Sequence, residues 1–259
     1  MTPRLKAFLD RSVPLPWLLA ALVAAGIGGA VLAQNAAPSE ATPEGRAAIE
    51  KIVRDYILAN PEIIPEAMTR LQSREASRLL ASNRTEIETP FAGAWAGNAK
   101  GDVTLVVFSD YACPYCKKGA KDVARLVGED KGLRVVFRDF PVLSPASEEA
   151  AMAALSAAQQ GRYVAFHDAL FEGPGKLSHE RIIATVRSTG LDERRTAKSL
   201  VAPELQAEVR RNLELGRALG LTGTPSYIVG ERVLSGAVGY EALKSAVAEA
   251  RAARAGQAG

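Results

Sequence analysis

The chain has few of the side chains that usually bind zinc, because its 259 residues include only two cysteines and two histidines. A structural zinc site needs about four such ligands, and His167 and His179 have no ligand-like spacing to each other. Basic residues are dispersed and the formal net charge is only +3, which leaves no concentrated phosphate-binding surface. We therefore expect no metal site, no cofactor and no nucleic-acid partner.

The N-terminal region contains the one long apolar stretch. Basic residues precede an uncharged segment at residues 13–33, which is the layout of an export leader. The segment is long enough to span a bilayer, while Val31 and Ala33 provide the small residues that a signal peptidase accepts. Residues 1–33 are thus predicted to be either a cleaved signal peptide or a membrane anchor. The basic flank favours export of everything that follows.

A helical region follows the leader. Residues 34–45 are small, polar and proline-containing, which is typical of a linker. Residues 46–90 form an extension in which apolar side chains recur at helical spacing, with an interruption at Asn60 and Pro61, and they predict two amphipathic helices. Two helices cannot bury their apolar stripe alone. The extension should therefore pack on the following domain or on another copy of itself.

The rest of the chain combines strand patterns with helical patterns. A helix is predicted after the first of several short strands. A helical block is predicted at residues 147–220, and a last helix at residues 240–254. This order indicates a mixed α/β fold whose helical block is long enough to be an inserted subdomain. The predicted strands are residues 103–110, 132–141, 224–230 and 231–239.

Both cysteines lie in "DYACPYCKKG", where the first predicted strand passes into a helix. A disulfide across so short a loop would remove little chain entropy from the unfolded state, so a purely structural role is weak. The free N–H groups and dipole at a helix N-terminus favour the thiolate of Cys113, and Pro114 fits the first helical position. We expect Cys113 to attack and the more buried Cys116 to resolve the mixed disulfide.

The Cys-Pro-Tyr-Cys motif that opens a helix, together with the later "GTPSYIVG", resembles the thioredoxin superfamily. The long helical block narrows the resemblance to DsbA-like proteins of bacterial envelopes. This resemblance implies a thioredoxin fold at residues 91–254 with a helical insertion at about 147–220. It places His167 in a packed helix and implies a cis peptide between Thr224 and Pro225 beside the cysteines.

The same resemblance implies where a substrate binds. An extended peptide would add as a strand along the backbone at Thr224 and Pro225, and Pro114 and Tyr115 complete the expected contacts. Many relatives carry a buried acid six residues before the first cysteine, where this chain has Val107. Asp110 lies nearer the motif, on another part of the strand end, so proton transfer is expected to use water or another group.

The segment "IEKIVRDYILANPEIIPEAM" resembles the N-terminal extension of the ScsC-like branch, copper-tolerance proteins related to DsbA in which such extensions join protomers. The resemblance favours a homo-oligomer formed through residues 46–90. It implies a periplasmic protein, either soluble after signal cleavage or anchored in the inner membrane by residues 13–33. A membrane redox partner of DsbB or DsbD type is also implied.

These features predict a thiol-disulfide oxidoreductase that forms, reduces or isomerises disulfides in exported proteins with cysteines. Thr224 and the extension resemble isomerases, whereas the helical insertion is shared with oxidases, and isomerase or reductase is favoured. One alternative is an envelope protein that sequesters Cu(I) with the same two thiolates, because soft thiolates suit Cu(I). Another is a membrane-tethered protein that serves one dedicated partner.

Overall fold

The computed structural model describes residues 43–257, which divide into two compact units, one ending at Met68 and the other beginning at Thr69. The predicted leader at residues 1–33 and most of the linker lie outside the described residues. Within the described residues, no helix is both long and apolar enough to cross a membrane.

The N-terminal region of the described chain is helical. Helix α3 (Pro43–Ala59) and helix α4 (Ile63–Ser82) are separated at Asn60, as the interruption in the apolar pattern predicted. Pro65 lies in the first turn of α4, where the missing N–H costs no intrahelical hydrogen bond. The short helix α5 (Arg84–Glu88), which the sequence did not predict, follows directly.

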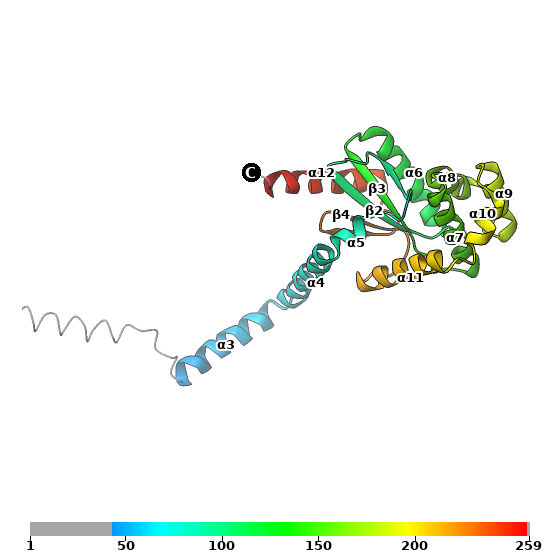
Figure 1. Ribbon diagram of the computed structural model, residues 1–259. Coiled ribbons are helices and arrows are strands. Elements are labelled where there is room, and N and C mark those ends of the chain that lie inside the picture. Colours follow the sequence, from blue (N-terminus) through cyan, green and yellow to red (C-terminus); the bar gives the residue numbers. More distant parts are fainter. Residues whose placement is uncertain (1–42, 258–259) are drawn as a thin grey trace, which may run out of the picture. The chain divides into compact units, whose positions relative to one another are not determined.

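The second unit contains a five-stranded sheet in the order β1-β3-β2-β4-β5 (Figure 1). Strands β2 and β3 are parallel, and the other neighbouring pairs are antiparallel. The sequence predicted four of these strands but missed β1, whose three residues lie in a stretch of turn-like composition. The strands are β1 (Trp95–Gly97), β2 (Val103–Ser109), β3 (Leu133–Asp139), β4 (Ser226–Val229) and β5 (Arg232–Ser235).

Helices cover both faces of this sheet. Helix α6 (Pro114–Glu129) and helix α12 (Tyr240–Gln257) pack together on one face, while α5 and helix α11 (Pro203–Ala218) contact the other (Figure 1). Because both faces are covered, the central strands are apolar on both sides. Leu105 belongs to the core on the α6 side, and Val106 belongs to the core on the α11 side.

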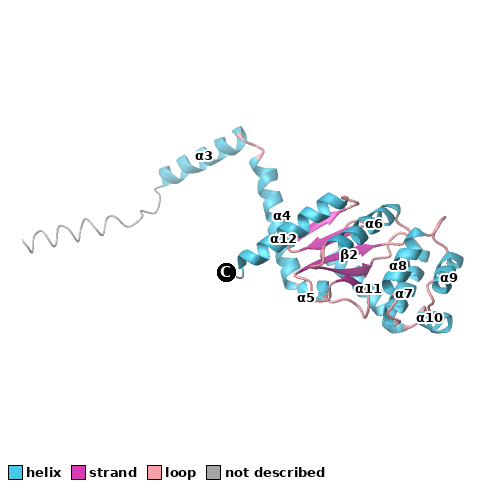
Figure 2. Ribbon diagram, turned by 90° about the horizontal axis from the view of Figure 1, so that it is seen from above, coloured by secondary structure: helices cyan, strands magenta, loops and turns pink. Residues whose placement is uncertain are grey.

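The helical block is confirmed as an inserted subdomain between β3 and β4. Its first four helices contact one another and gather beyond one end of the sheet (Figure 2), and α11 then leads back toward β4. The fold is therefore a thioredoxin-type sheet with a helical insertion, preceded by a helical N-terminal region. The four helices are α7 (Pro145–Gln159), α8 (Tyr163–Glu172), α9 (His179–Ser188) and α10 (Glu193–Ser199).

Part of the predicted extension belongs to the core of the second unit. Leu80 of α4 and Ile87 of α5 are each only 2% exposed and lie in one cluster with Phe108 and Ile228. The sequence placed both residues in the extension at residues 46–90. A cut at residue 90 would therefore remove side chains that the sheet requires.

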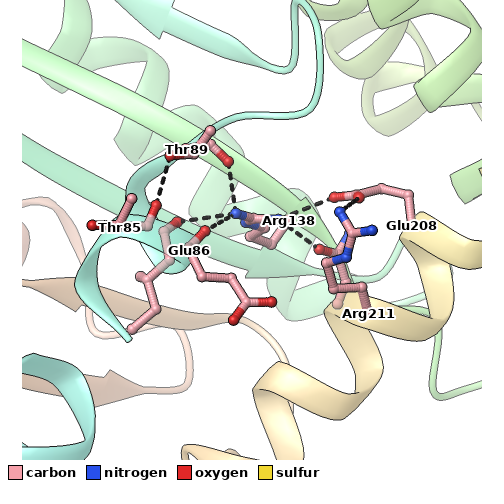
Figure 3. Close-up of polar contacts among 8 residues, drawn as sticks. Thr85, Glu86, Thr89, Arg138, Glu208 and Arg211 are labelled. Carbon is pink, nitrogen blue, oxygen red and sulfur yellow. Dashed lines mark hydrogen bonds and ion pairs between the residues drawn. The ribbon is translucent and has the colours of Figure 1, made fainter. Parts of the chain in front are cut away.

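A buried arginine fixes two of the helices to the sheet. The guanidinium of Arg138 on β3 donates hydrogen bonds to the side chains of Glu208 and Asn212 on α11, each at 3.0 Å. Since a buried charge is costly unless it is paired and hydrogen-bonded, these partners make its position in the core possible. The same guanidinium donates to backbone carbonyl oxygens at the end of α5 (Figure 3), namely those of Glu86, Ile87 and Thr89.

Candidate active site

The two cysteines lie at the start of helix α6, after the short turn that follows β2. Cys113 is the N-cap residue, and Pro114 is the first residue of the helix. Both thiols are unpaired and buried, and Cys116, at 2% exposed, is more deeply buried than Cys113, at 5%. The placement of Cys113 follows from the sequence, because a helix that begins with proline leaves the preceding residue as its cap.

The hydrogen bonds of the two sulfur atoms differ. The Cys113 thiol donates to the carbonyl oxygen of Thr224 at 3.3 Å. The Sγ of Cys116 accepts a long hydrogen bond, 3.5 Å, from the backbone N–H of Asp110. Burial raises the pKa of the Cys116 thiol to about 12. Cys116 is therefore protonated at neutral pH and must lose a proton before it can act as a nucleophile.

The loop before β4 brings its residues to the cysteines from 111 positions along the chain. The peptide bond between Thr224 and Pro225 is cis, as the resemblance implied. Pro114 and Tyr115 are exposed beside the cysteines, Tyr115 to 66%. The residues that the sequence predicted to bind substrate are thus brought together at one end of α6.

Asp110 organises the turn that precedes the cysteines, a contribution that the sequence did not predict. Its carboxylate accepts hydrogen bonds from three backbone N–H groups, those of Ala112 at 2.8 Å, Val142 at 2.8 Å and Leu143 at 2.9 Å. Asp110 is 1% exposed, so these bonds replace its hydration. The residue ties the cysteine turn to the loop after β3.

Val107, the position where many relatives are expected to carry an acid, lies opposite Tyr227 in the antiparallel pairing of β2 with β4. Tyr227 is 1% exposed, and any side chain at Gly119 of α6 would collide with its hydroxyl oxygen. Burial raises the pKa of Tyr227, and so do Cys116, Asp122 and Cys113 when they are ionised. Sequence reasoning missed Tyr227, because strand alternation alone does not say which residue lies opposite Val107.

A second cluster of buried polar side chains adjoins the cysteine turn through Tyr111. The Tyr111 hydroxyl is hydrogen-bonded to Nδ1 of His167 at 3.1 Å, and the Tyr163 hydroxyl donates to Asp139 at 3.0 Å. Burial raises the pKa of Asp139 to about 7 and lowers the pKa of His167 to about 3. His167 is therefore a neutral side chain in the packed helix α8, as predicted.

Lys117 connects the cysteine helix to the insertion. Its ammonium donates hydrogen bonds to the carbonyl oxygens of Glu172 and Gly173, at 3.3 and 3.2 Å, where α8 ends. A cation at the C-terminus of a helix complements the unpaired carbonyl groups there. The first turn of α6 is thereby fixed to the helical subdomain.

No group of three or more His, Cys, Asp or Glu side chains in the described part of the chain is arranged to hold a metal ion. Two free thiols at a helix N-terminus, beside a cis-proline loop on a mixed sheet, define the class instead. This is a thioredoxin-fold protein with a thiol pair.

Family comparisons agree with this class. Residues 104–248 match the DSBA-like thioredoxin domain, and residues 46–78 match the copper resistance protein ScsC N-terminal domain. The first match spans more than half of the chain, so the chain belongs to the DsbA-like thiol-disulfide oxidoreductase family.

Solved structures extend the comparison. A thioredoxin-like oxidoreductase from Silicibacter pomeroyi is 40% identical, with a TM-score of 0.61 over 64% of this chain and 95% of that one. The thiol-disulfide exchange protein alpha-DsbA2 from Wolbachia pipientis is 29% identical, with a TM-score of 0.64 over 69% and 97%. A linker-deletion mutant of ScsC from Proteus mirabilis is 28% identical, with a TM-score of 0.67 over 83% and 99%.

Among curated proteins, the chain resembles part of a much longer protein, the Na(+)/H(+) antiporter NhaA 1 of Salinispora arenicola. The two are 28% identical over 156 residues, which is 60% of this chain and 24% of the antiporter. The chain thus spans about a quarter of the length of the curated relatives it matches first.

Proposed function

We propose that this chain is a periplasmic thiol-disulfide oxidoreductase that acts on exported proteins with cysteines. The proposal rests above all on the position of the Cys113 sulfur, 3.3 Å from the carbonyl oxygen of Thr224, with Cys116 one turn further along the same helix. A sulfur beside an extended loop can meet a substrate cysteine that is held along that loop. Backbone pairing at Thr224, next to Pro225, would hold the substrate with little dependence on its side chains.

The exchange has two steps. The Cys113 thiolate attacks one sulfur of a substrate disulfide, forming a mixed disulfide while the other substrate sulfur leaves as a thiolate and takes up a proton. Cys116 then loses its proton and attacks the Cys113 sulfur, which breaks the mixed disulfide and releases the second substrate thiol. The substrate gains two electrons, and the chain is left with a Cys113–Cys116 disulfide. The reverse sequence oxidises a substrate dithiol.

Isomerisation uses the first step alone. After Cys113 has formed the mixed disulfide, another thiol of the same substrate can attack the substrate sulfur and return Cys113 to its thiolate. Thr224 and the helical extension support isomerase or reductase activity, and the helical insertion supports oxidase activity. Exposed Pro114 and Tyr115 would contact the substrate beside the attacking sulfur.

Substitution of the two cysteines tests the proposal. Cys113→Ser should abolish reduction of oxidised glutathione and of a protein disulfide. The remaining thiol, Cys116, is buried and protonated at neutral pH and so cannot begin the exchange. Cys116→Ser is the matched control, since it should still form the mixed disulfide but be unable to resolve it. Mass spectrometry would detect the trapped adduct, and exchange that survives Cys113→Ser would refute the proposal.

The N-terminal sequence supports a periplasmic address and a redox partner in the inner membrane. Residues 13–33 would serve as a cleaved signal or as an anchor, and the basic flank favours export of the remainder. A DsbB-type partner would maintain the disulfide form of the chain, whereas a DsbD-type partner would maintain the dithiol form. The redox state of Cys113 and Cys116 in cells would distinguish the two partners.

Self-association through the extension is also part of the proposal. Helix α3 exposes several large apolar side chains, and the match of residues 46–78 to an ScsC N-terminal domain supports a second copy of this chain as the partner. The exposed apolar side chains of α3 are Ile49, Ile52, Val53, Tyr56 and Leu58.

Cu(I) sequestration is a second candidate, supported by two unpaired thiols and by the description of that matched domain as part of a copper resistance protein. Two thiolates suit a soft cation. Titration of the reduced chain with Cu(I) against a weak chelator tests this candidate. Failure to compete with the chelator would exclude it, and Cys116→Ser is the control that removes one ligand.

A further inference from the structure

The second exchange step requires a proton to leave Cys116, and the groups nearest to its sulfur do not provide an exit. The backbone N–H of Asp110 donates a hydrogen bond to Sγ, and Thr224 approaches the same sulfur from the loop before β4. Neither group titrates near neutral pH. Cys113 is engaged in the mixed disulfide during this step, so it cannot accept the proton.

Tyr227 brings a hydroxyl group to this region from the neighbouring strand. Because Tyr227 lies opposite Val107, both side chains project from the same face of the sheet, the face that α6 covers. The small aliphatic side chain of Val107 leaves the larger phenol as the polar group at this cross-strand pair. No hydrogen bond joins the Tyr227 hydroxyl to another protein group among the described residues, so a proton reaches or leaves this hydroxyl through water.

The Tyr227 hydroxyl contacts α6 at Gly119, and the neighbours of Gly119 on the helix are the groups that the hydroxyl can approach. Cys116, Gly119 and Asp122 follow one another at intervals of three residues, so Gly119 is a neighbour on the helix surface both of Cys116 and of Asp122. The Tyr227 hydroxyl lies against Gly119, the middle residue, because any larger residue there would collide with it. It therefore sits between the buried sulfur of Cys116 and Asp122, which is only half-buried.

We propose that the Tyr227 hydroxyl relays a proton between Cys116 and the Asp122 carboxylate during the second exchange step, an inference that rests on the proposed oxidoreductase function. Through bridging water, Cys116 gives its proton to the phenol oxygen as the phenol gives its own proton to Asp122. Asp122 then passes that proton to solvent. The resulting Cys116 thiolate attacks Cys113, and the substrate thiolate that leaves takes up a proton.

In the reverse direction, Cys116 leaves the disulfide as a thiolate and recovers its proton by the same route. The phenol stays neutral throughout, as its burial requires, since burial raises the pKa of Tyr227 and disfavours phenolate. The ionisable groups that affect the pKa of this hydroxyl come from α6 and its N-cap residue, namely Cys116, Asp122 and Cys113. The relay requires glycine at position 119, because a side chain there would occupy the space of the Tyr227 hydroxyl.

Reaction of the reduced full chain with 5,5′-dithiobis(2-nitrobenzoate) separates the two steps. Cys113 releases the first thionitrobenzoate, and Cys116 then displaces the second one from Cys113. Tyr227→Phe should slow the second release by about tenfold or more near neutral pH, in line with the usual size of acid–base effects, and leave the first release unchanged. Asp122→Asn should also slow the second release and shift the pH dependence of its rate to higher pH.

Tyr240→Phe is the matched control, because it removes a phenol hydroxyl that is bonded to Glu129, a residue at the far end of α6 from the cysteines. Its two release rates should equal those of the wild type. Second-release profiles that coincide with the wild type from pH 5 to 9 in either relay variant would overturn the relay. If Tyr227→Phe fails to fold, Asp122→Asn decides alone. Absence of second release from the wild type would instead overturn the proposed function.

Discussion

Asp139 and His167 lie in one buried cluster, and their pKa shifts act on stability in opposite directions. Burial raises the pKa of Asp139 to about 7, so the folded chain keeps a proton that the unfolded chain loses, and stability falls as pH rises from about 4 to 7. Burial lowers the pKa of His167 to about 3, so stability falls as pH falls from about 6.5 to 3. The two effects oppose each other between about pH 4 and 6.5.

Asp139→Asn should remove this compensation. The amide keeps an oxygen that can accept the Tyr163 hydroxyl but does not titrate, so the slope due to His167 remains. Relative to the wild type, the free energy of unfolding should rise with pH by about 1.4 kcal/mol per unit between about pH 4 and 6.5. Urea unfolding across this range measures it. The phenols of Tyr111 and Tyr163 do not contribute, because burial raises both pKa values well above this range.

The control for this prediction is Asp55→Asn, which removes an exposed carboxylate from α3. Its stability profile should follow that of the wild type. Parallel profiles for the wild type and Asp139→Asn would show that Asp139 titrates equally in the folded and unfolded chains, contrary to the effect of its burial.

Asp110→Ala is predicted to loosen the loop after β3. Alanine offers no acceptor, so the backbone N–H groups of Val142 and Leu143 lose the carboxylate oxygen that both of them share. Hydrogen exchange followed by NMR should show faster exchange at the amides of Val142 and Leu143. The Val135 amide in β3 serves as the internal reference, and unchanged exchange in the loop relative to it would contradict this role of Asp110.

At the scale of elements, Arg138 decides how β3 holds α5 and α11 (Figure 3). Arg138→Ala should lower the free energy of unfolding by about 3–5 kcal/mol, because it leaves the buried carboxylate of Glu208 without its buried partner. It also leaves the carbonyl oxygens at the end of α5 without their donor. Urea unfolding of the whole chain measures the loss.

Arg211→Ala is the matched control for Arg138→Ala. Arg211 pairs with the same carboxylate of Glu208 at 3.0 Å, but its side chain is 57% exposed. Exposed ion pairs contribute only about 0–1 kcal/mol, so this variant should be nearly as stable as the wild type. Equal losses in the two variants would mean that burial does not set the strength of these pairs.

At the scale of the whole molecule, the proposed oligomerisation through α3 would have the largest functional consequence. Ile52→Glu places a charge on the apolar side of α3, where Ile52 is 67% exposed, and should convert an oligomer to a monomer in analytical ultracentrifugation. Ala47→Glu introduces the same charge on the other side of the helix and should leave the oligomer intact. A wild-type chain that sediments as a monomer would contradict the prediction.

A comparison of the whole chain with a chain that lacks the extension tests whether the activity is isomerisation. Reactivation of a scrambled multi-disulfide protein should require the extension if its helices build an oligomeric cleft. The shortened chain for this test should begin at residue 69, where the second compact unit begins, because Leu80 and Ile87 belong to its core. Thiol oxidation without reactivation, equal in both chains, would instead indicate a DsbA-like oxidant.

The sequence by itself determined the elements whose signals are local. The apolar period of α3, the proline that follows Cys113 and the nearly continuous apolar run of β2 each act within a few residues of the chain. From these signals follow a mixed α/β fold with a helical insertion and the thiol pair at a helix N-terminus. The position of Thr224 and Pro225 beside that pair followed only from a family resemblance, because nothing local links residues so far apart.

Tertiary structure decided the rest. Strand β1 exists because three residues pair with β3, and the burial of Arg138 depends on partners from two helices far away in sequence. Likewise, Tyr227 lies opposite Val107 only because β2 and β4 pair in one register. Helical periodicity is set by neighbouring residues, but the desolvation and pairing of a polar group depend on which segments meet. The thiol pair was therefore visible in the sequence, whereas the groups that surround it became visible only in the folded chain.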